Sequence, residues 1–222
     1  MRFVYRTITA VKRHGFKQFH EQCRIMPKAL VILSEGAEEM ETVIAVDVLR
    51  RGGIDVTLAG LMNSDPVLCS RNVKIVPDAA LSDAVKQGPY DVVVCPGGAN
   101  GAKNLAASKE VGEILQDQEK GGRVIAAVCA APIALASHKV GSGKNVTSHP
   151  SVKDKLGKYI TSKTTVTLCF VVVFQFTSTR DRSTGGKLKS RGPGPASSLE
   201  IVEAIQGKEK ADSLVAPMLV KM

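Results

Sequence analysis

Residues 123–132 read RVIAAVCAAP, a continuous apolar run that ends at Cys129 and is followed by small residues and a proline. A strand that is apolar on both faces is typical of a parallel sheet covered by helices on each side. Small residues at positions 127 and 131 permit a sharp turn from strand to helix, and Pro132 suits the first turn of that helix. The run therefore predicts a buried strand, a tight turn at Cys129 and a helix.

The chain on the N-terminal side of this run alternates between strand and helix patterns. Strands are expected at 29–33, 55–59 and 91–95, helices at 38–51, 80–86 and 109–120, and a hairpin over 63–77. Such alternation predicts an α/β fold with a mostly parallel central sheet between helical layers. Ligands in these folds bind beyond the carboxyl ends of the strands, which is where candidate residues are sought.

The composition of the 222 residues limits the classes of protein to consider. With 44% apolar and 23% charged residues, the chain suits one globular domain or two small ones, and coiled coils, collagen and wholesale disorder are excluded. No apolar run reaches the roughly 18 residues of a membrane-spanning helix. The five cysteines occur singly, without CxxC or CxxH pairs. Neither a disulfide framework nor a metal site is expected, a reducing compartment is favoured, and no cofactor motif appears.

The net charge of +9 is concentrated at the N-terminus. Residues 1–26 hold six Lys and Arg and one acid, so the other residues carry 24 basic and 20 acidic side chains. No surface interleaving basic and aromatic residues is indicated, and nucleic-acid binding is not expected. Residues 1–25 form a basic extension, either an organelle-targeting segment or a tail.

Cys129 is the candidate nucleophile among the cysteines. Backbone N–H groups and the positive end of the following helix would lower the pKa of its thiol. The alternative is a buried structural cysteine, since free cysteines are commonly buried. Cys95 also ends a strand, but Pro96 follows it and supplies no N–H group, so Cys95 is interpreted as packing. Cys69, in a turn-like segment, is a candidate exposed and oxidisable thiol.

Three carboxylates, at Glu38, Glu39 and Glu41, begin the helix after the first strand. Acids there commonly complement the helix dipole. A glutamate that assists Cys129 must instead be protonated and partly buried, because an ionised carboxylate would raise the pKa of the thiol. Periodicity does not choose among the three.

Further candidates follow other strands. His149 is a candidate general base, with a surface histidine as the alternative, and His138 is the poorer choice. Gly97 and Gly98 permit close backbone approach and are candidates to donate an N–H group to an oxyanion together with the amide of Ala130. Pro-Gly-Gly is also a common turn.

Several long motifs, in order, resemble the DJ-1/PfpI superfamily. The similarity runs from about Lys28 to Tyr159 and resumes from about Gly186 to the end. It is carried by ALVILSEGAEEMETVIAVDVLRRGGIDVTLAG (29–60), LCSRN (68–72), PYDVVVCPGGANGAKNL (89–105), VIAAVCAAPIAL (124–135), VTSHP (146–150) and SRGPG (190–194). The resemblance implies that residues 26–222 form a flavodoxin-like three-layer sandwich that assembles as a homodimer.

The resemblance also implies roles for single residues. Cys129 matches the nucleophile and redox-sensing cysteine, Glu41 the protonated glutamate beside it and His149 the nearby histidine. The amides of Gly98 and Ala130 match the oxyanion donors. The remaining matches are the peripheral pair Cys69 and Arg71 near the dimer surface, and the dimer-face positions Asp47 and Arg51.

The activity that the resemblance implies is a cysteine-dependent, glutathione-independent glyoxalase and deglycase. Its substrates would be methylglyoxal and glyoxal or their adducts on proteins and nucleotides, and the protein would also sense oxidative stress. The alternative is a non-enzymatic chaperone switched by oxidation of Cys129. Peptidase activity is not expected, because Ala130 stands where the peptidase branch has a histidine. The expected location is cytoplasmic, with nuclear and mitochondrial pools.

Two departures from the superfamily pattern stand out. Ala131 stands where the superfamily has a glycine after the tight turn, and this replacement narrows the turn. Residues 160–185 replace a short polar hairpin, and within them Val166–Phe176 has only two polar residues. That run is too short to cross a bilayer and is hazardous as an exposed strand. Impaired dimerisation, instability or a mis-spliced reading are hypotheses for this segment.

Overall fold

The computed structural model describes residues 26–142, 144–157, 160–161, 171–174 and 195–218. Expectations for the extension 1–25 and for most of the segment 160–185 lie outside the described residues. Within them, none of the helices is long and apolar enough to cross a membrane.

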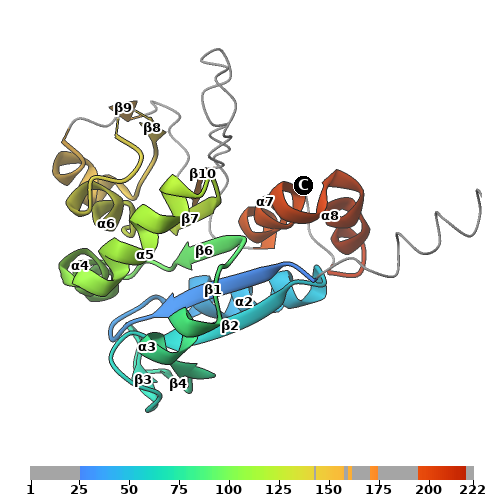
Figure 1. Ribbon diagram of the computed structural model, residues 1–222, viewed down its shortest axis with the longest axis horizontal. Helices are drawn as coiled ribbons and strands as arrows, with labels where there is room; N and C mark the ends of the chain where they lie inside the picture. Colours follow the sequence, from blue (N-terminus) through green and yellow to red (C-terminus); the bar gives the residue numbers. More distant parts are fainter. Residues whose placement is uncertain (1–25, 143, 158–159, 162–170, 175–194, 219–222) are drawn as a thin grey trace, which may run out of the picture.

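The centre of the molecule is a six-stranded sheet in the order β10-β7-β6-β1-β2-β5 (Figure 1). Neighbouring strands are parallel except for β10, which is antiparallel to β7. The strands are β1 (Lys28–Leu33), β2 (Asp55–Gly60), β5 (Ala79–Ala80), β6 (Val92–Cys95), β7 (Val124–Val128) and β10 (Val171–Phe174). Every residue of β6 and β7 is buried, because helices cover both faces of the sheet. The predicted α/β sandwich with a mostly parallel sheet is confirmed.

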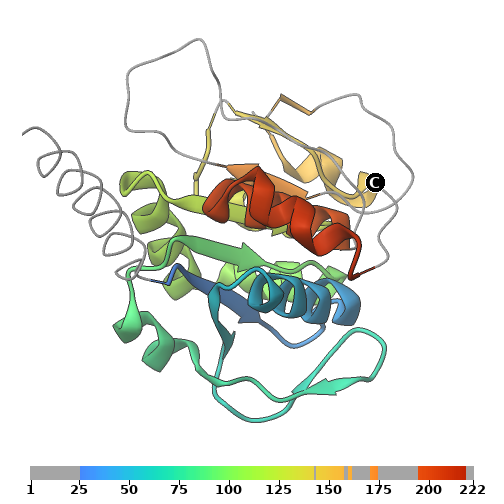
Figure 2. The ribbon, with the colours of Figure 1, turned by 90° about the vertical axis from the view of Figure 1, so that its right-hand side faces the viewer.

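Helices cover the sheet on its two faces (Figure 2). On one face α7 packs against α2 and α8, and on the other α4 and α5 pack against α6. The helical elements are α2 (Glu39–Arg51), α3 (Leu81–Ala84), the 3-10 turn η1 (Val85–Gln87), α4 (Ala99–Ala107), α5 (Lys109–Lys120), α6 (Pro132–Ser137), the 3-10 turn η2 (Pro150–Lys155), α7 (Pro195–Gln206) and α8 (Lys208–Val215).

Two short strand pairs complete the described residues. Strands β3 (Val67–Leu68) and β4 (Lys74–Ile75) pair antiparallel, which confirms the predicted hairpin. Strands β8 (Asn145–Val146) and β9 (Ile160–Thr161) pair in parallel. These pairs lie outside the six-stranded sheet.

Helix α4 and strand β10 are among the elements that the sequence patterns missed. Helix α4 was not expected, because its sequence ANGAKNLAA follows Pro-Gly-Gly and has the composition of a turn. Strand β10 comes from the atypical apolar segment and pairs with β7 from Val171 opposite Val128 to Phe174 opposite Ile125. Part of that segment therefore has a place at the edge of the sheet, directly beside the strand that leads to Cys129.

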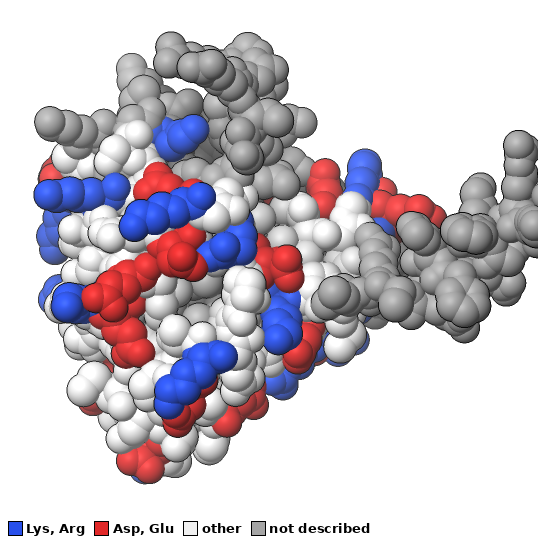
Figure 3. All heavy atoms as spheres, viewed as in Figure 1, with Lys and Arg blue, Asp and Glu red and all other residues white. Residues whose placement is uncertain are grey.

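Charged side chains are mixed in sign on the face shown in Figure 3. Lys and Arg lie there among Asp and Glu. Some of the charged side chains that the structure describes are paired, such as Lys109 with Glu113. On this face, the described residues thus form no extended basic stripe of the kind that binds nucleic acid.

Candidate active site

Cys129 lies directly after β7 in a strained backbone conformation. Its φ is +58°, a left-handed value that costs a non-glycine residue about 1 to 2 kcal/mol. The Ala131 N–H group donates to the Val128 carbonyl at 2.8 Å, which closes the turn, and Pro132 begins α6. The tight strand-to-helix turn predicted from the sequence is confirmed, and the small residues around it tolerate the crowding.

Glu41 is buried in the first turn of α2 and reaches the loop after β6. Its Oε2 accepts the Gly97 N–H group at 2.7 Å. A Cβ atom added to Gly97 would lie 2.7 Å from that same oxygen and 2.7 Å from the Cβ of Cys129. The carboxyl group and the cysteine thus both lie against Gly97, and only glycine leaves room for both.

The other two glutamates of this helix have different partners. Glu38 is the N-cap and accepts the Glu41 N–H group at 2.9 Å. Glu39 accepts hydrogen bonds from the Ser70 hydroxyl, at 2.8 Å, and from the Arg71 N–H group. Burial alone would raise the pKa of Glu39, but these hydrogen bonds and one from its own backbone outweigh it and lower the pKa. Of the three carboxylates, Glu41 is the one next to Cys129.

The loops after β1 and β6 approach each other closely at Gly98. Its φ is +86°, and a Cβ atom there would lie 2.3 Å from the Gly36 carbonyl oxygen. The Glu38 N–H group also donates to the Gly97 carbonyl at 3.2 Å. Because the Gly97 amide already donates to Glu41, the expectation that it serves as an oxyanion donor is corrected. Gly98, with Ala130, remains the candidate for that role.

His149 is joined to Cys129 through the backbone. Its N–H group donates to the Cys129 carbonyl at 2.7 Å. Its Nδ1 accepts the Ser151 N–H group at 3.2 Å and lies 2.8 Å from the Ser151 hydroxyl. His138, by contrast, has its Nε2 2.9 Å from the Leu105 carbonyl oxygen and packs against Gly112. The structure therefore places His149, and not His138, beside Cys129.

The chain is similar to a known protein family. The model of the DJ-1/PfpI family matches residues 27–175. The chain belongs to the DJ-1/PfpI family. Its relatives include the Parkinson disease protein 7 homolog of Danio rerio, which is 48% identical over 198 residues, covering 87% of this chain and 97% of that protein. Another is the glutathione-independent glyoxalase DJR-1.2 of Caenorhabditis elegans, 38% identical over 86% of this chain and 95% of that protein.

Solved structures of the DJ-1/PfpI family share the fold. The crystal structure of Drosophila melanogaster DJ-1beta superposes with a TM-score of 0.75 and 45% sequence identity, covering 89% of this chain and all of that one. The flavodoxin-like fold expected from the motifs is thereby established, and enzymatic activity occurs among the relatives.

The residues assigned to the periphery of the site lie in the hairpin and on α2. Cys69 is 4% exposed, so the expectation of an exposed, oxidisable thiol is wrong. Burial, followed by the negative charges of Glu39 and Glu38, raises the pKa of Cys69 to about 11. The Arg71 side chain is exposed and donates to the Ser70 carbonyl at 3.2 Å.

The positions matched to the dimer face lie on α2, and Cys95 lies in the core. Asp47 and Arg51 form an exposed ion pair at 2.8 Å on α2. Cys95 is fully buried, and burial raises its pKa to about 12, which confirms that it packs in the core. Among the residues that the structure describes, no group of three His, Cys, Asp or Glu side chains is arranged to hold a metal ion.

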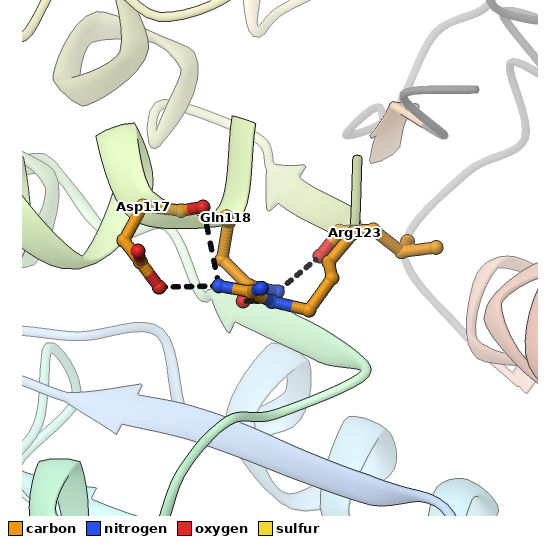
Figure 4. Close-up of polar contacts among 4 residues, drawn as sticks. Asp117, Gln118 and Arg123 are labelled. Carbon is orange, nitrogen blue, oxygen red and sulfur yellow. Dashed lines mark hydrogen bonds and ion pairs between the residues drawn. The ribbon is translucent and has the colours of Figure 1, made fainter. Parts of the chain in front are cut away.

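A separate cavity of about 510 Å³ lies between α5 and the segments leading into β6 and β7. Asp117, Gln118 and Arg123 line this cavity, and Figure 4 shows their side chains converging. Arg123 Nε donates to Gln118 Oε1 at 2.6 Å, and Gln118 Nε2 donates to the Val124 carbonyl at 3.0 Å. Arg123 also pairs with Asp117. These polar groups hold one another, so this wall of the cavity joins α5 to β7.

Sequence reasoning missed Ser151 as a member of the site. A serine two residues after a histidine has no catalytic signature of its own. The signal was the Pro150 between them, because proline commonly begins a helical turn and the residue before it then caps that turn. Here the capping group is the His149 ring.

Proposed function

We propose that the chain is a cysteine-dependent, glutathione-independent glyoxalase that also removes methylglyoxal and glyoxal adducts from proteins and nucleotides. The observation that carries the proposal is that Cys129 and the Glu41 carboxyl group lie together against Gly97. The relative named a glutathione-independent glyoxalase supports the reaction class.

In the proposed reaction, the Cys129 thiolate adds to the aldehyde carbon of methylglyoxal and forms a carbon–sulfur bond. The amides of Gly98 and Ala130 stabilise the oxyanion, which takes a proton to become a hemithioacetal. The former aldehyde hydrogen then moves as a proton to the neighbouring carbon, which leaves a thioester of lactate. Water hydrolyses the thioester, releases lactate and restores the thiol. Addition of one water to methylglyoxal balances the reaction without an external oxidant or reductant.

Glu41 fits the acid in this scheme. Its Oε2 accepts a backbone N–H group, so a proton on the neutral carboxyl resides on Oε1. A neutral carboxyl leaves the thiolate form of Cys129 undisturbed, whereas an ionised one would repel it. Adducts on cysteine, arginine or lysine side chains present the same carbon to the same sulfur.

The proposal is tested by replacing the nucleophile. Cys129→Ala removes the sulfur, and lactate formation from methylglyoxal should fall at least about 100-fold, because no covalent intermediate forms. Circular dichroism and thermal unfolding should show an intact fold. Cys69→Ala is the matched control and should retain activity, because Cys69 lies in the hairpin and takes no part in the proposed reaction. Lactate production by Cys129→Ala near the wild-type rate contradicts the proposal.

A second candidate is a redox-regulated chaperone in which Cys129 is the switch. A related solved structure is titled as oxidized Toxoplasma gondii DJ-1, with 27% identity to this chain. Thiolates in positive surroundings oxidise readily to sulfenic and sulfinic acids, so one sulfur can serve both functions. Suppression of client aggregation that requires peroxide and Cys129, without lactate formation, favours this candidate.

A further inference from the structure

The short turn η2 is capped by an imidazole ring. His149 precedes the turn, and its Nδ1 accepts the Ser151 N–H group at 3.2 Å. The Ser151 hydroxyl oxygen lies 2.8 Å from the same nitrogen. The backbone N–H group of His149 donates to the Cys129 carbonyl at 2.7 Å. The backbone N–H group of His149 is therefore bonded to Cys129, and its ring is bonded to Ser151.

The backbone contact determines where the ring carries its proton. A backbone N–H group only donates, so the nitrogen that it meets must offer a lone pair. Nδ1 of the neutral ring is then the acceptor, and Nε2 carries the hydrogen. The Ser151 hydroxyl rotates freely and donates to the same lone pair. We infer that Ser151 is a positioning residue that holds His149 as the Nε2–H tautomer.

This inference rests on the proposed function for its chemical meaning. A ring with Nδ1 held by Ser151 and hydrogen on Nε2 donates to a substrate oxygen, and it does not take a proton from carbon through Nε2. His149 then stabilises an oxygen of the aldehyde or of the enediolate that follows it. The transfer of the proton between the two carbons is left to Glu41, which becomes a carboxylate once its own proton has passed to the oxyanion.

The test compares ring tautomers and kinetics in the full chain. Long-range proton–nitrogen NMR correlation of nitrogen-15-labelled protein distinguishes the two ring nitrogens, and a His149→Asn spectrum identifies the signals of His149 among the four histidines. Ser151→Ala removes the hydroxyl and leaves the weaker N–H contact. The population ratio of the two tautomers should shift about fivefold toward Nδ1–H, with a similar fall in kcat and an unchanged KM for methylglyoxal.

Two further variants separate positioning from general stability. Ser148→Ala is the matched control, because the Ser148 hydroxyl bonds the His149 carbonyl oxygen at 3.2 Å and not the ring. It should leave the tautomer unchanged. Ser151→Thr keeps the hydroxyl and should restore both the wild-type spectrum and kcat.

The outcomes bear on the inference and on the proposed function separately. Three results would overturn the inference even if lactate forms. The first is an Nδ1–H tautomer in the wild type, and the second is a Ser151→Ala spectrum identical to that of the wild type. The third is a Ser151→Thr variant that does not recover the wild-type spectrum and kcat. An Nε2–H tautomer that depends on the Ser151 hydroxyl, in a protein that makes no lactate, supports the positioning role and rejects the proposed glyoxalase activity.

Discussion

Gly97 shows how one residue without a side chain organises the site. Its N–H group holds Glu41, and its missing Cβ leaves the space that the Glu41 carboxyl group and Cys129 share. The strained backbone of Cys129 is maintained because the surrounding buried residues leave the turn no room to relax. The strain at Cys129 and the space beside Gly97 both arise from the close approach of the loops after β1, β6 and β7.

Gly97→Ala tests the role of this space. The added methyl group would lie 2.7 Å from both Glu41 Oε2 and the Cβ of Cys129, closer than unbonded atoms approach. One of the two side chains must move, and we expect lactate formation to fall about 100-fold.

Gly157→Ala is the matched control for this substitution. It adds the same methyl group at a φ of +57° with nothing within 4 Å, so it should cost about 1 kcal/mol of stability through backbone strain and leave the activity unchanged. Full activity of Gly97→Ala in a steady-state assay would show that the spacing of Glu41 and Cys129 is not needed.

At the scale of the element, the first turn of α2 assigns a different task to each of its acids. Glu38 caps the helix, Glu39 joins it to the hairpin at Ser70 and Arg71, and Glu41 lies next to Cys129. A helical repeat of 3.6 residues spreads neighbouring positions around the axis, so adjacent acids meet different partners. A single helix end therefore supplies both a structural anchor and a catalytic candidate.

Glu39→Gln tests the structural anchor through its pH dependence. The pKa of Glu39 is lowered in the folded state, so its carboxylate stabilises the fold above the unfolded pKa of about 4.3, and this stabilisation is lost as the pH falls through the folded value. We expect the variant to unfold with about 1 to 3 kcal/mol less free energy at pH 7 and to match the wild type in strong acid.

Denaturant unfolding at several pH values measures this difference. Glu35→Gln provides the control, because Glu35 is exposed and should give a small difference at every pH. A Glu39→Gln deficit that stays constant down to strong acid would show that the carboxylate charge does not contribute.

At the scale of the whole molecule, α2 presents an apolar stripe to solvent. Met40 and Val43 are 62% and 52% exposed, and the Asp47–Arg51 pair continues the same exposed side one turn later. Large apolar side chains at such spacing on a surface helix are typical of a protein–protein contact. We propose that this stripe is where two copies of the chain meet.

Val43→Lys tests the proposed dimer. A lysine charge at the centre of an apolar interface is costly to bury, so we expect the mass from light scattering to change from that of a dimer to that of a monomer. Val85→Lys is the control, since Val85 is also exposed but lies on η1 beside the α5 cavity. A monomeric wild type, or a dimer that both substitutions leave intact, contradicts the proposed interface.

Periodicity and local sterics were enough to predict strands β1, β2, β6 and β7, helices α2, α3, α5 and α6, and the tight turn at Cys129. A buried parallel strand must be apolar along its whole length, and a sharp turn must have small neighbouring residues. Both features can therefore be predicted from consecutive residues of the sequence. The superfamily motifs added the choice of Glu41 among the three glutamates and the expected roles of the other matched residues. Helix α4 escaped prediction because glycine, asparagine and alanine are ordinary turn residues, and its helical state depends on packing against α6.

The tertiary structure alone decided the contacts between distant segments. Glu41 and Gly97 are 56 positions apart, and only their contact distinguishes Glu41 from its neighbours and removes the Gly97 amide from the oxyanion donors. The burial of Cys69 likewise depends on how the hairpin lies against α2. Local sequence determines which conformations each segment prefers, whereas the partner of a buried polar group is determined by which segments the folded sheet brings together.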